Sequence, residues 1–261
     1  MTDLRVFVEA WKSAADAVVE LAEGLTVEQL QLPTDCPEWT VHDVLAHLAH
    51  LETVLLSAPE PAGDAAVVPS DYTAAGVAER RSVPTPDVVT EFQHAVAARY
   101  SALAELPEDP SQIAPVTPSG VPWSWETLLR NRVVDVWTHE QDVRRAVDLP
   151  GNLGSAGAAV TAHTFAAGMP FVLGKKVKAP AGTAVRWVVD GGVPFTVGAV
   201  VGDDGRARRD DDAEPDATLT MTTEAFTVLA AGRRGPDDVE VAVEGDADLA
   251  RRVLDAMTLT F

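Results

Sequence analysis

Three histidines stand close together in the stretch DCPEWTVHDVLAHLAHLE, residues 35–52. They are His42, His47 and His50, and the spacing of the apolar residues around them predicts one amphipathic helix. Neutral imidazole is a common ligand for divalent metals, whereas a histidine on a polar helix face is ordinary solvated surface. The direction of each side chain therefore decides which histidine is a candidate ligand.

Helical geometry separates these three residues. Each residue advances roughly 100°, so His47 lies roughly 60° from Val44 and roughly 40° from Leu51, inside the edge of the apolar stripe. His50 projects onto the flank of that stripe, and His42 projects onto the opposite, polar face. We therefore expect only His47 to look into the protein, and we expect His42 and His50 to be replaceable. The stripe itself consists of Val41, Val44, Leu48, Leu51 and Leu55.

A second segment, RVVDVWTHEQDVRRA at residues 132–146, offers the complement to His47. Asp135 and His139 are four residues apart, so on a helix they lie on one face, and apolar neighbours turn that face inward. Asp142 shares the face and can orient an imidazole. Two imidazoles and a carboxylate make an open three-ligand metal site. The alternative is an exposed helical Asp–His contact, which is common by chance.

These candidate ligands need helices to position them, and the first half of the chain is helical by pattern. Apolar residues recur at three- and four-residue steps over residues 4–21, and Gly24 is a plausible stop. Thr40 with Asp43 resembles a capping box at the start of the histidine helix. Two further helices are expected after Thr85-Pro86, ending by Pro107, and from Ser124 to Pro150. A loop rich in Ala, Pro and Gly is expected over residues 57–70.

Four such helices predict an antiparallel four-helix bundle over residues 1–150. After residue 150 the pattern changes to one more helix, at 155–173, followed by short strands. The expected strands are TAVRWVVD, PFTVGAVV after a Gly-Gly turn, ATLTM and VEVAVEG, with helices at TTEAFTVLAAG and DADLARRVLDAM. The charged GDDGRARRDDDAEPD is expected to be a solvated hairpin or loop. Residues 151–261 are therefore predicted to be a small α+β domain.

Composition excludes several functions. The chain of 261 residues has 40 acidic and 20 basic residues, a formal charge of −20, which repels nucleic acid and anionic membranes. No signal peptide and no apolar run long enough to span a bilayer stand out. With Cys36 as the single cysteine, no disulfide can form within the chain. We expect a cytoplasmic protein, a monomer or homodimer, with small-molecule partners.

The sequence resembles a known family at three places. CPEWTVHDVLAHLAHLE resembles the Cys-x-x-Trp-Thr-Val-x-Asp-x-x-x-His-Leu signature of mycothiol-dependent maleylpyruvate isomerases and their DinB-like relatives. RVVDVWTHEQDVRRA resembles the Arg-x-x-Glu-x-x-x-His-x-x-Asp helix of the same family, and the end of the chain resembles its sterol-carrier-protein-like domain. The resemblance implies a DinB-like bundle holding a divalent metal, typically zinc, through His47, Asp135 and His139. Asp135 stands where the family usually has Glu.

The family resemblance also implies thiol chemistry. The low-molecular-weight thiol mycothiol binds as a thiolate at the open metal position, because coordination removes the thiol proton. The thiolate adds to the double bond of maleylpyruvate, the bond rotates, and the thiol leaves as fumarylpyruvate forms. Related enzymes act instead as S-transferases on an electrophilic substrate. A dianionic substrate needs cationic partners, and the candidates are Arg80, Arg81, Arg233 and Arg234, whose alternative role is to balance nearby acids.

Two other functions stay open at this point. In a metal-dependent hydrolase the same metal would activate water instead of a thiol. In a non-catalytic binding module the bundle would have lost its metal through the replacement at Asp135. Trp39 and Trp137 can line a pocket, although large aromatics at helical spacing are more often core residues. Cys36, without a basic neighbour in the sequence, is expected to be structural or inert.

Overall fold

The structure, a computed structural model, describes residues 3–57 and 67–260. The chain divides into two compact units, Met1–Gly151 and Asn152–Phe261, which are described separately. The expected boundary, between residues 150 and 151, lies one residue from this division. Most of the loop expected over residues 57–70 falls outside the described residues.

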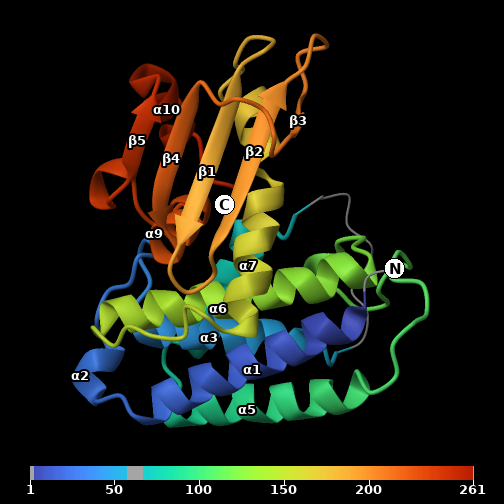
Figure 1. Cartoon of the computed structure of the whole chain (residues 1–261). Coiled ribbons are helices and arrows are strands. Elements are labelled where there is room, and N and C mark those ends of the chain that lie inside the picture. Colours follow the sequence, from blue (N-terminus) through green and yellow to red (C-terminus); the bar gives the residue numbers. More distant parts are fainter. Residues whose placement is uncertain (1–2, 58–66, 261) are drawn as a thin grey trace. The chain divides into compact units, whose positions relative to one another are not determined.

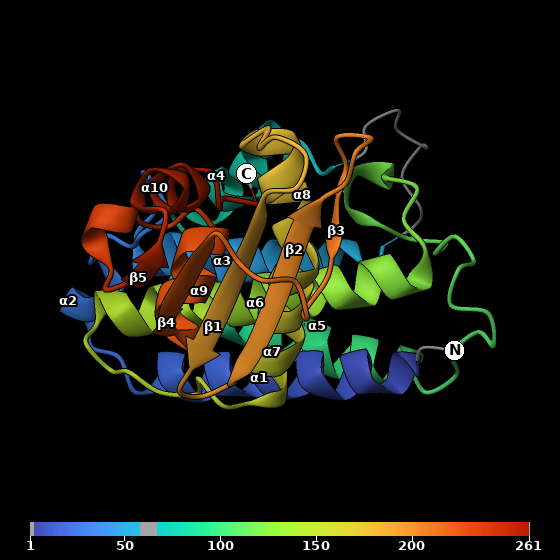
Figure 2. The ribbon, with the colours of Figure 1, turned by 45° about the horizontal axis from the view of Figure 1, so that its top comes forward.

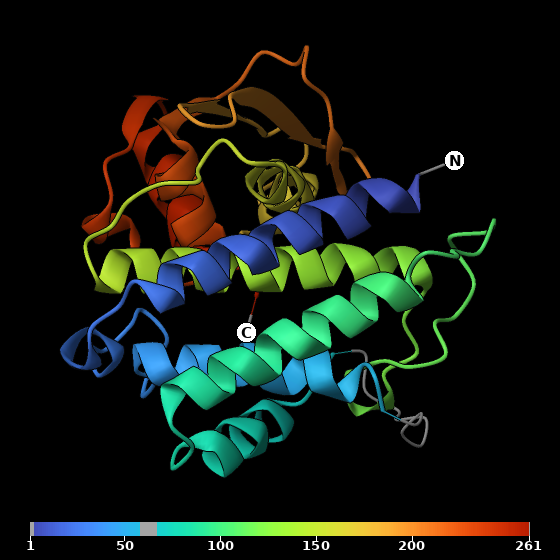
Figure 3. The ribbon, with the colours of Figure 1, turned by 90° about the horizontal axis from the view of Figure 1, so that it is seen from below.

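The first unit is helical, as the periodicity predicts, and its core is a bundle of four long helices (Figures 1 and 3). In this bundle α1 packs on α6, α3 packs on α5, and α1 also contacts α5. The apolar stripes supply the core, which includes Trp11, Leu48 and Trp137. The long helices are α1 (Leu4–Glu23), α3 (Val41–Val54), α5 (Thr85–Ala102) and α6 (Trp125–Ala146), and the short ones are α2 (Val27–Leu30), α4 (Ser70–Arg80) and the 3-10 turn η1 (Pro118–Gly120).

The helix ends follow the expected signals in most places. Gly24 is the C-cap of α1, and Thr40 caps α3 through a reciprocal pair of hydrogen bonds with Asp43. Ser124 caps α6 by accepting a hydrogen bond from the backbone N–H of Thr127. The helix α5 ends at Ala102, before Pro107, the residue expected to stop it.

The helix α4 was not predicted, and its presence changes the assignment of His42. This helix packs on α3 and covers the face that the sequence assigned to solvent. His42 is buried, with Nδ1 2.8 Å from Thr85 Oγ1 and Nε2 3.1 Å from the Arg80 carbonyl oxygen. The prediction of a solvated His42 is therefore wrong, because a fifth helix lies over it. The ring of His50 also faces α4, 5.4 Å from the ring of Tyr72.

The second unit is an α+β structure built on one mixed sheet of five strands, in the order β3-β2-β1-β4-β5 (Figure 2). The strand β1 pairs antiparallel with β2 and parallel with β4, while β3 and β5 form the antiparallel edges. The strands are β1 (Ala184–Asp190), β2 (Phe195–Val201), β3 (Ala207–Arg209), β4 (Ala217–Thr222) and β5 (Ala242–Gly245). The four expected strands are confirmed, and the charged segment after β2 forms a hairpin that contains β3.

The helices of this unit pack on the sheet through its buried residues. Along β1 and β4 buried side chains alternate with more exposed ones, and Trp187 and Leu219 belong to the buried set. The helices α8, α9 and α10 contact the sheet, and α7 contacts α9. They are α7 (Ala156–Ala167), α8 (Met169–Phe171), the π-helical turn η2 (Val172–Lys176), α9 (Thr223–Ala230), the 3-10 turn η3 (Pro236–Asp238) and α10 (Ala247–Asp255).

One segment of the second unit is apolar enough to qualify as a membrane span. By length and composition alone, Ala156–Lys176 meets this criterion, although no apolar run of that length was expected. Half of its most apolar stretch, 50%, is buried inside the structure. A helix in the core of a globular unit meets the same criterion, so this segment is weak evidence for a membrane.

Candidate metal centre

The structure brings His47, Asp135 and His139 together inside the bundle, from α3 and α6. Asp135 Oδ1 lies 3.3 Å from Nε2 of His47 and 3.7 Å from Nε2 of His139. One candidate ligand atom from each of the three residues lies within 4.8 Å of the other two. Both histidines are buried, and the Asp135 side chain is 26% exposed. The aspartate therefore lies between the two imidazoles, with a partial opening to solvent.

These three side chains fit a divalent metal in type and spacing. A tetrahedral zinc with bonds of about 2.1 Å separates its ligand atoms by roughly 3.4 Å, close to both distances measured from Asp135 Oδ1. Nitrogen from two histidines and oxygen from one carboxylate are a ligand set of catalytic zinc sites, which keep a fourth position for water or substrate. Aspartate at position 135 is thus long enough to share a site with both histidines.

His139 is held in this orientation by a carboxylate behind it. Its Nδ1 lies 3.0 Å from Oδ2 of Asp142, which leaves Nε2 directed at Asp135. Asp142 is fully buried, and Arg145 donates a 2.6 Å hydrogen bond to its other oxygen. Arg145 also donates to Asp35. A carboxylate on the far nitrogen of a ligating histidine fixes the tautomer and raises its basicity, so Asp142 can take the orienting role that the sequence suggested.

His47 is oriented by packing. Its Nδ1 is buried and has no hydrogen-bond partner among the described residues. The ring of Trp39 lies 5.0 Å from the His47 ring and 6.0 Å from the His139 ring, and the two imidazoles are 4.7 Å apart. Trp39 thus lines the site, whereas Trp137 is a buried core residue.

A tight turn before α3 places Trp39 and Cys36 at the site. Pro33 pairs with Thr40 as an antiparallel bridge, and the backbone N–H of Trp39 donates to the Cys36 carbonyl. Glu38, between them, has a φ of 66°, in the left-handed region that non-glycine residues seldom adopt. The positions of the Cys36 and Trp39 side chains are therefore set by this turn and not by helical periodicity.

The residues around the Cys36 thiol in the structure come from α6 and differ from its neighbours in the sequence. Its Sγ donates to Oδ2 of Asp142 at 3.2 Å and lies 3.8 Å from Nδ1 of His139. The sequence places no basic residue next to Cys36, but the fold does, because α6 brings His139 to it. The cysteine is buried and makes a second group of possible metal ligands with His139 and Asp142. Sequence reasoning missed this contact because it depends on the turn.

Burial and neighbouring charges set the protonation of the site. Burial lowers the pKa of His47 to about 4, although Asp135 partly opposes this. Burial also acts to lower the pKa of His139, but Cys36, Asp142 and Asp135 beside it raise that pKa to about 10. Burial acts to raise the pKa of Asp135, but Arg132 and His47 hold it well below its usual value. At neutral pH His47 is therefore neutral and Asp135 ionised, the forms that bind metal, while His139 must release a proton first.

Of the four arginines predicted to bind substrate, Arg80, Arg81 and Arg233 donate hydrogen bonds to other groups of the protein. Arg80 is mostly buried and donates to both oxygens of Glu91, at 3.1 and 2.6 Å. Arg81 is 56% exposed and donates to Asp43. In the second unit, Arg233 donates to the Ala231 carbonyl, and Arg234 is exposed. Substrate binding by these arginines stays a prediction.

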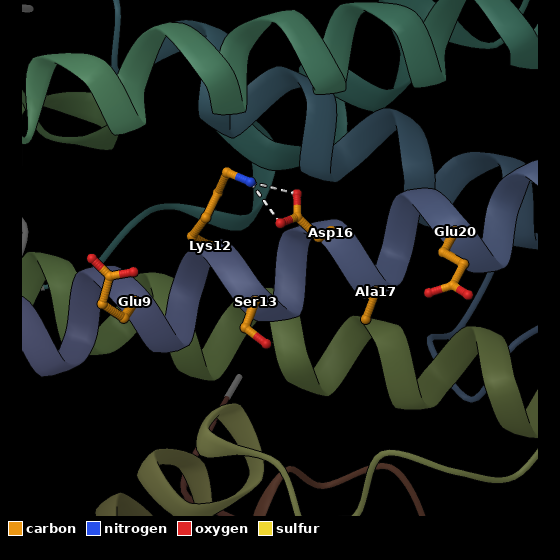
Figure 4. A pocket seen from close by; sticks show the side chains of 6 residues that line it. All are labelled: Glu9, Lys12, Ser13, Asp16, Ala17 and Glu20. Carbon is orange, nitrogen blue, oxygen red and sulfur yellow. Dashed lines mark hydrogen bonds and ion pairs between the residues drawn. The ribbon is translucent and has the colours of Figure 1, made fainter.

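The helix α1 carries a surface depression lined by none of the predicted site residues (Figure 4). Lys12 in this depression pairs with Asp16 one turn later, at 2.6 Å. Such a pair at the surface contributes little to the stability of the fold. The depression is lined by the α1 residues Glu9, Lys12, Ser13, Asp16, Ala17 and Glu20.

Comparisons with known proteins identify relatives of both units. The chain matches the mycothiol maleylpyruvate isomerase N-terminal domain over residues 11–144, and the C-terminal domain of the same family over residues 159–252. The crystal structure of a mycothiol-dependent maleylpyruvate isomerase covers 92% of this chain and 93% of its own, at 17% identity and a TM-score of 0.60. A histidine-to-alanine mutant of a mycothiol-dependent maleylpyruvate isomerase gives 16% identity and a TM-score of 0.59, with the same coverage.

Two other comparisons add little. Sterol carrier protein 2 from Yarrowia lipolytica covers 42% of the chain at 12% identity and a TM-score of 0.28, a likeness too distant to bear on function. No curated protein sequence matches the chain. The two domain matches together span most of the sequence, in the order expected from the motifs. The chain therefore belongs to the mycothiol maleylpyruvate isomerase family.

Proposed function

We propose that this protein is a metal-dependent enzyme that uses a low-molecular-weight thiol, mycothiol, as its nucleophile. In this proposal His47, Asp135 and His139 hold the metal, zinc or another divalent ion. The substrate is an unsaturated acid like maleylpyruvate, which the enzyme isomerises, or an electrophile to which it transfers the thiol. The observation that carries the proposal is the convergence of the three ligand atoms within 4.8 Å of one another.

The chain's own residues support this chemistry in distinct ways. A divalent metal in such a site supplies ionisation of a coordinating thiol at neutral pH. Asp142 holds His139 by Nδ1, so that Nε2 faces the ligand position. Trp39 packs against both imidazoles and excludes water from one side of them. The 26% exposure of the Asp135 side chain is consistent with a site that a small molecule can reach.

In the isomerisation, the thiolate sulfur forms a bond to one carbon of the substrate double bond, whose electrons move toward the adjacent carbonyl. The remaining single bond rotates, the electrons return, and the carbon–sulfur bond breaks, so that the thiolate leaves unchanged. In the transferase reaction the new carbon–sulfur bond is kept, and the enolate formed by the addition takes up a proton from water. Carboxylates of the substrate need cations, for which Arg80, Arg81, Arg233 and Arg234 are the candidates.

Cobalt-substituted protein tests the thiol directly. A cobalt site gives a visible spectrum that changes when sulfur binds, so addition of mycothiol should shift the spectrum, while the His139→Ala variant should show no shift. Incubation with maleylpyruvate then separates the two reactions: conversion without consumption of mycothiol indicates an isomerase, and loss of free thiol indicates a transferase. A cobalt spectrum indifferent to mycothiol, together with turnover of an ester or amide, would instead favour a hydrolase.

The geometry of this site speaks against the alternative of a non-catalytic binding module. It assumed that Asp135 is a defective ligand, yet Asp135 Oδ1 lies near both histidine nitrogens. We also propose a cytoplasmic location, because a single buried cysteine and thiol chemistry suit a reducing compartment. Whether the protein acts as a monomer or a homodimer stays a prediction that solution mass measurements can test.

A further inference from the structure

A cluster of three buried charged side chains and one buried tryptophan joins the four long helices of the bundle. Each helix contributes one side chain: Trp11 from α1, Glu52 from α3, Arg99 from α5 and Arg132 from α6. None of the four is more than 4% exposed. Buried charges are costly unless they are paired and hydrogen-bonded. The hydrogen bonds and ion pairs among these residues therefore show what the cluster can do.

Glu52 is the centre of the cluster. Its Oε1 accepts hydrogen bonds from Nε and Nη2 of Arg132, at 3.0 and 2.8 Å, and from Nε1 of Trp11 at 2.9 Å. Its Oε2 accepts from Nη1 of Arg99, whose guanidinium lies over the Trp11 ring. The carboxylate thus fixes the plane and position of the Arg132 guanidinium from one side.

The other side of Arg132 reaches the candidate metal centre. Its Nη1 donates to Oδ2 of Asp135 at 2.9 Å, while Oδ1 of the same carboxylate faces His47 and His139. The charges agree with this arrangement, because two arginines and Glu52 leave one positive charge, which Asp135 neutralises. One guanidinium therefore links the core carboxylate to the candidate ligand.

We infer that Glu52 and Arg132 are positioning residues that aim the Asp135 carboxylate at the metal, an inference that rests on the proposed function. Aspartate carries its carboxylate on a shorter arm than glutamate, so its direction matters more for a ligand that must meet His47 on the neighbouring helix α3 and His139 on its own helix α6. Arg132 holds the oxygen that faces away from the histidines, and Glu52 prevents the guanidinium from turning.

Two physical effects of Arg132 on metal binding oppose each other. A positive charge near a cation site weakens metal binding, whereas a fixed hydrogen-bond donor to the ligating carboxylate strengthens it. The variants Arg132→Lys and Arg132→Met separate them, because lysine keeps the charge but has no planar fork. If orientation dominates, both variants bind metal more weakly, by about 10- to 100-fold. If charge dominates, Arg132→Met binds more tightly and Arg132→Lys stays near wild type, which would overturn the inference.

Arg99→Lys is the matched control. Arg99 donates to the same Glu52 carboxylate from an equally buried position, but its contacts are with Glu52 and Trp11 and not with Asp135. Its replacement should reduce stability toward urea and leave the metal dissociation constant within a factor of about three of wild type. Equal losses of metal affinity in Arg99→Lys and Arg132→Lys would mean that the cluster acts only through general stability, and would contradict the inference.

The longer carboxylate provides a second test, independent of the stability of each variant. In Asp135→Glu the extra methylene lets the carboxylate reach the histidines in more than one way, so the effect of Arg132→Lys on zinc affinity should shrink several-fold in this background. The measurement is a zinc titration of the four proteins of this cycle with a competing chelator. An undiminished effect would contradict the inference. Failure of wild type to bind zinc, cobalt or manganese would instead overturn the proposed function itself.

Discussion

The three histidines of α3 differ in what surrounds their rings, and this gives each a distinct expected response to replacement. His42 and His50 lie against α4, whereas His47 faces Asp135. We expect the His42→Gln and His50→Gln variants to contain as much metal as the wild type but to unfold at lower urea concentrations. His47→Gln should lose metal. Elemental analysis of the purified variants checks this, and a metal loss in His42→Gln equal to that in His47→Gln would contradict the assignment.

Asp142 is a second residue whose role a single replacement can test. The Asp142→Asn replacement keeps the shape of the side chain but removes the charge that holds Nδ1 of His139. We expect zinc affinity to fall by about 10- to 100-fold. Glu140→Gln is the control, since Glu140 is equally buried on α6 but pairs with Arg144. Isothermal titration with zinc should show little change in this control, and unchanged affinity in Asp142→Asn would refute the orienting role.

Individual residues were predictable where helical periodicity alone decides their direction. His47, Asp135 and His139 come together because each lies on the inner face of a regular helix. Cys36 and Trp39 could not be placed, because they depend on a turn with Glu38 in a left-handed conformation. The Glu52 cluster was missed although a signal existed: Glu52 and Arg132 each follow an apolar stripe residue, Leu48 or Leu128, by four positions.

At the scale of elements, the helix α4 depends on close packing at Gly76. A Cβ atom on this residue would come within 2.2 Å of the His50 ring. Helix propensity alone favours alanine over glycine by about 1 kcal/mol, but overpacking costs about 1–3 kcal/mol. We therefore expect Gly76→Ala to lower the free energy of unfolding by about 1 kcal/mol. Urea unfolding measures this difference.

The ring of His50 supplies the control for this prediction. In a His50→Ala background the ring is gone, so Gly76→Ala should become neutral or stabilising, as helix propensity predicts. A stabilising effect of Gly76→Ala in the wild type, with no dependence on His50, would show that α4 does not pack as described.

Elements with a strong signal were predictable, and those without one were not. The helices α1, α3 and α6 have long apolar stripes and side-chain caps, so their positions follow from the sequence. The helix α4 has no side-chain cap and only two buried residues, Gly76 and Val77, so no periodicity reveals it. Strands β1, β2 and β4 follow from alternation and β-branched residues, but the parallel pairing of β1 with β4 is a matter of topology that strand patterns do not encode.

The cluster around Glu52 should make the stability of the whole helical bundle depend on pH. Burial acts to raise the pKa of Glu52, but Arg99 and Arg132 outweigh it and hold the folded-state pKa below its usual value of 4.5. The ionised carboxylate therefore contributes stability that is fully present above pH 4.5 and is lost as the pH falls below it. We expect Glu52→Gln to cost about 3–5 kcal/mol at pH 7, because it leaves two arginines under-compensated.

The difference in unfolding free energy between wild type and Glu52→Gln should narrow as the pH falls below 4.5. Urea unfolding at a series of pH values measures it. Glu105→Gln, at an exposed position, is the control and should differ little from wild type at any pH. A difference that stays constant down to acid pH, or widens, would contradict an ionised Glu52 in the folded protein.

The overall composition agrees with small-molecule chemistry inside an acidic protein. A formal charge of −20 disfavours polyanionic partners. Both domains of the mycothiol maleylpyruvate isomerase family are present in order. In the proposed metal site the carboxylate ligand is the aspartate at position 135, and Arg132 donates a hydrogen bond to the oxygen that faces away from the histidines.

Zinc titration of the metal-free protein determines whether His47, Asp135 and His139 together bind one divalent metal. Wild type should bind one zinc per chain, and His47→Ala, Asp135→Ala and His139→Ala should each lose that binding while keeping a cooperative unfolding transition. Wild-type protein that binds no zinc, or three alanine variants that bind it as tightly as wild type, would show that these residues do not form a metal site.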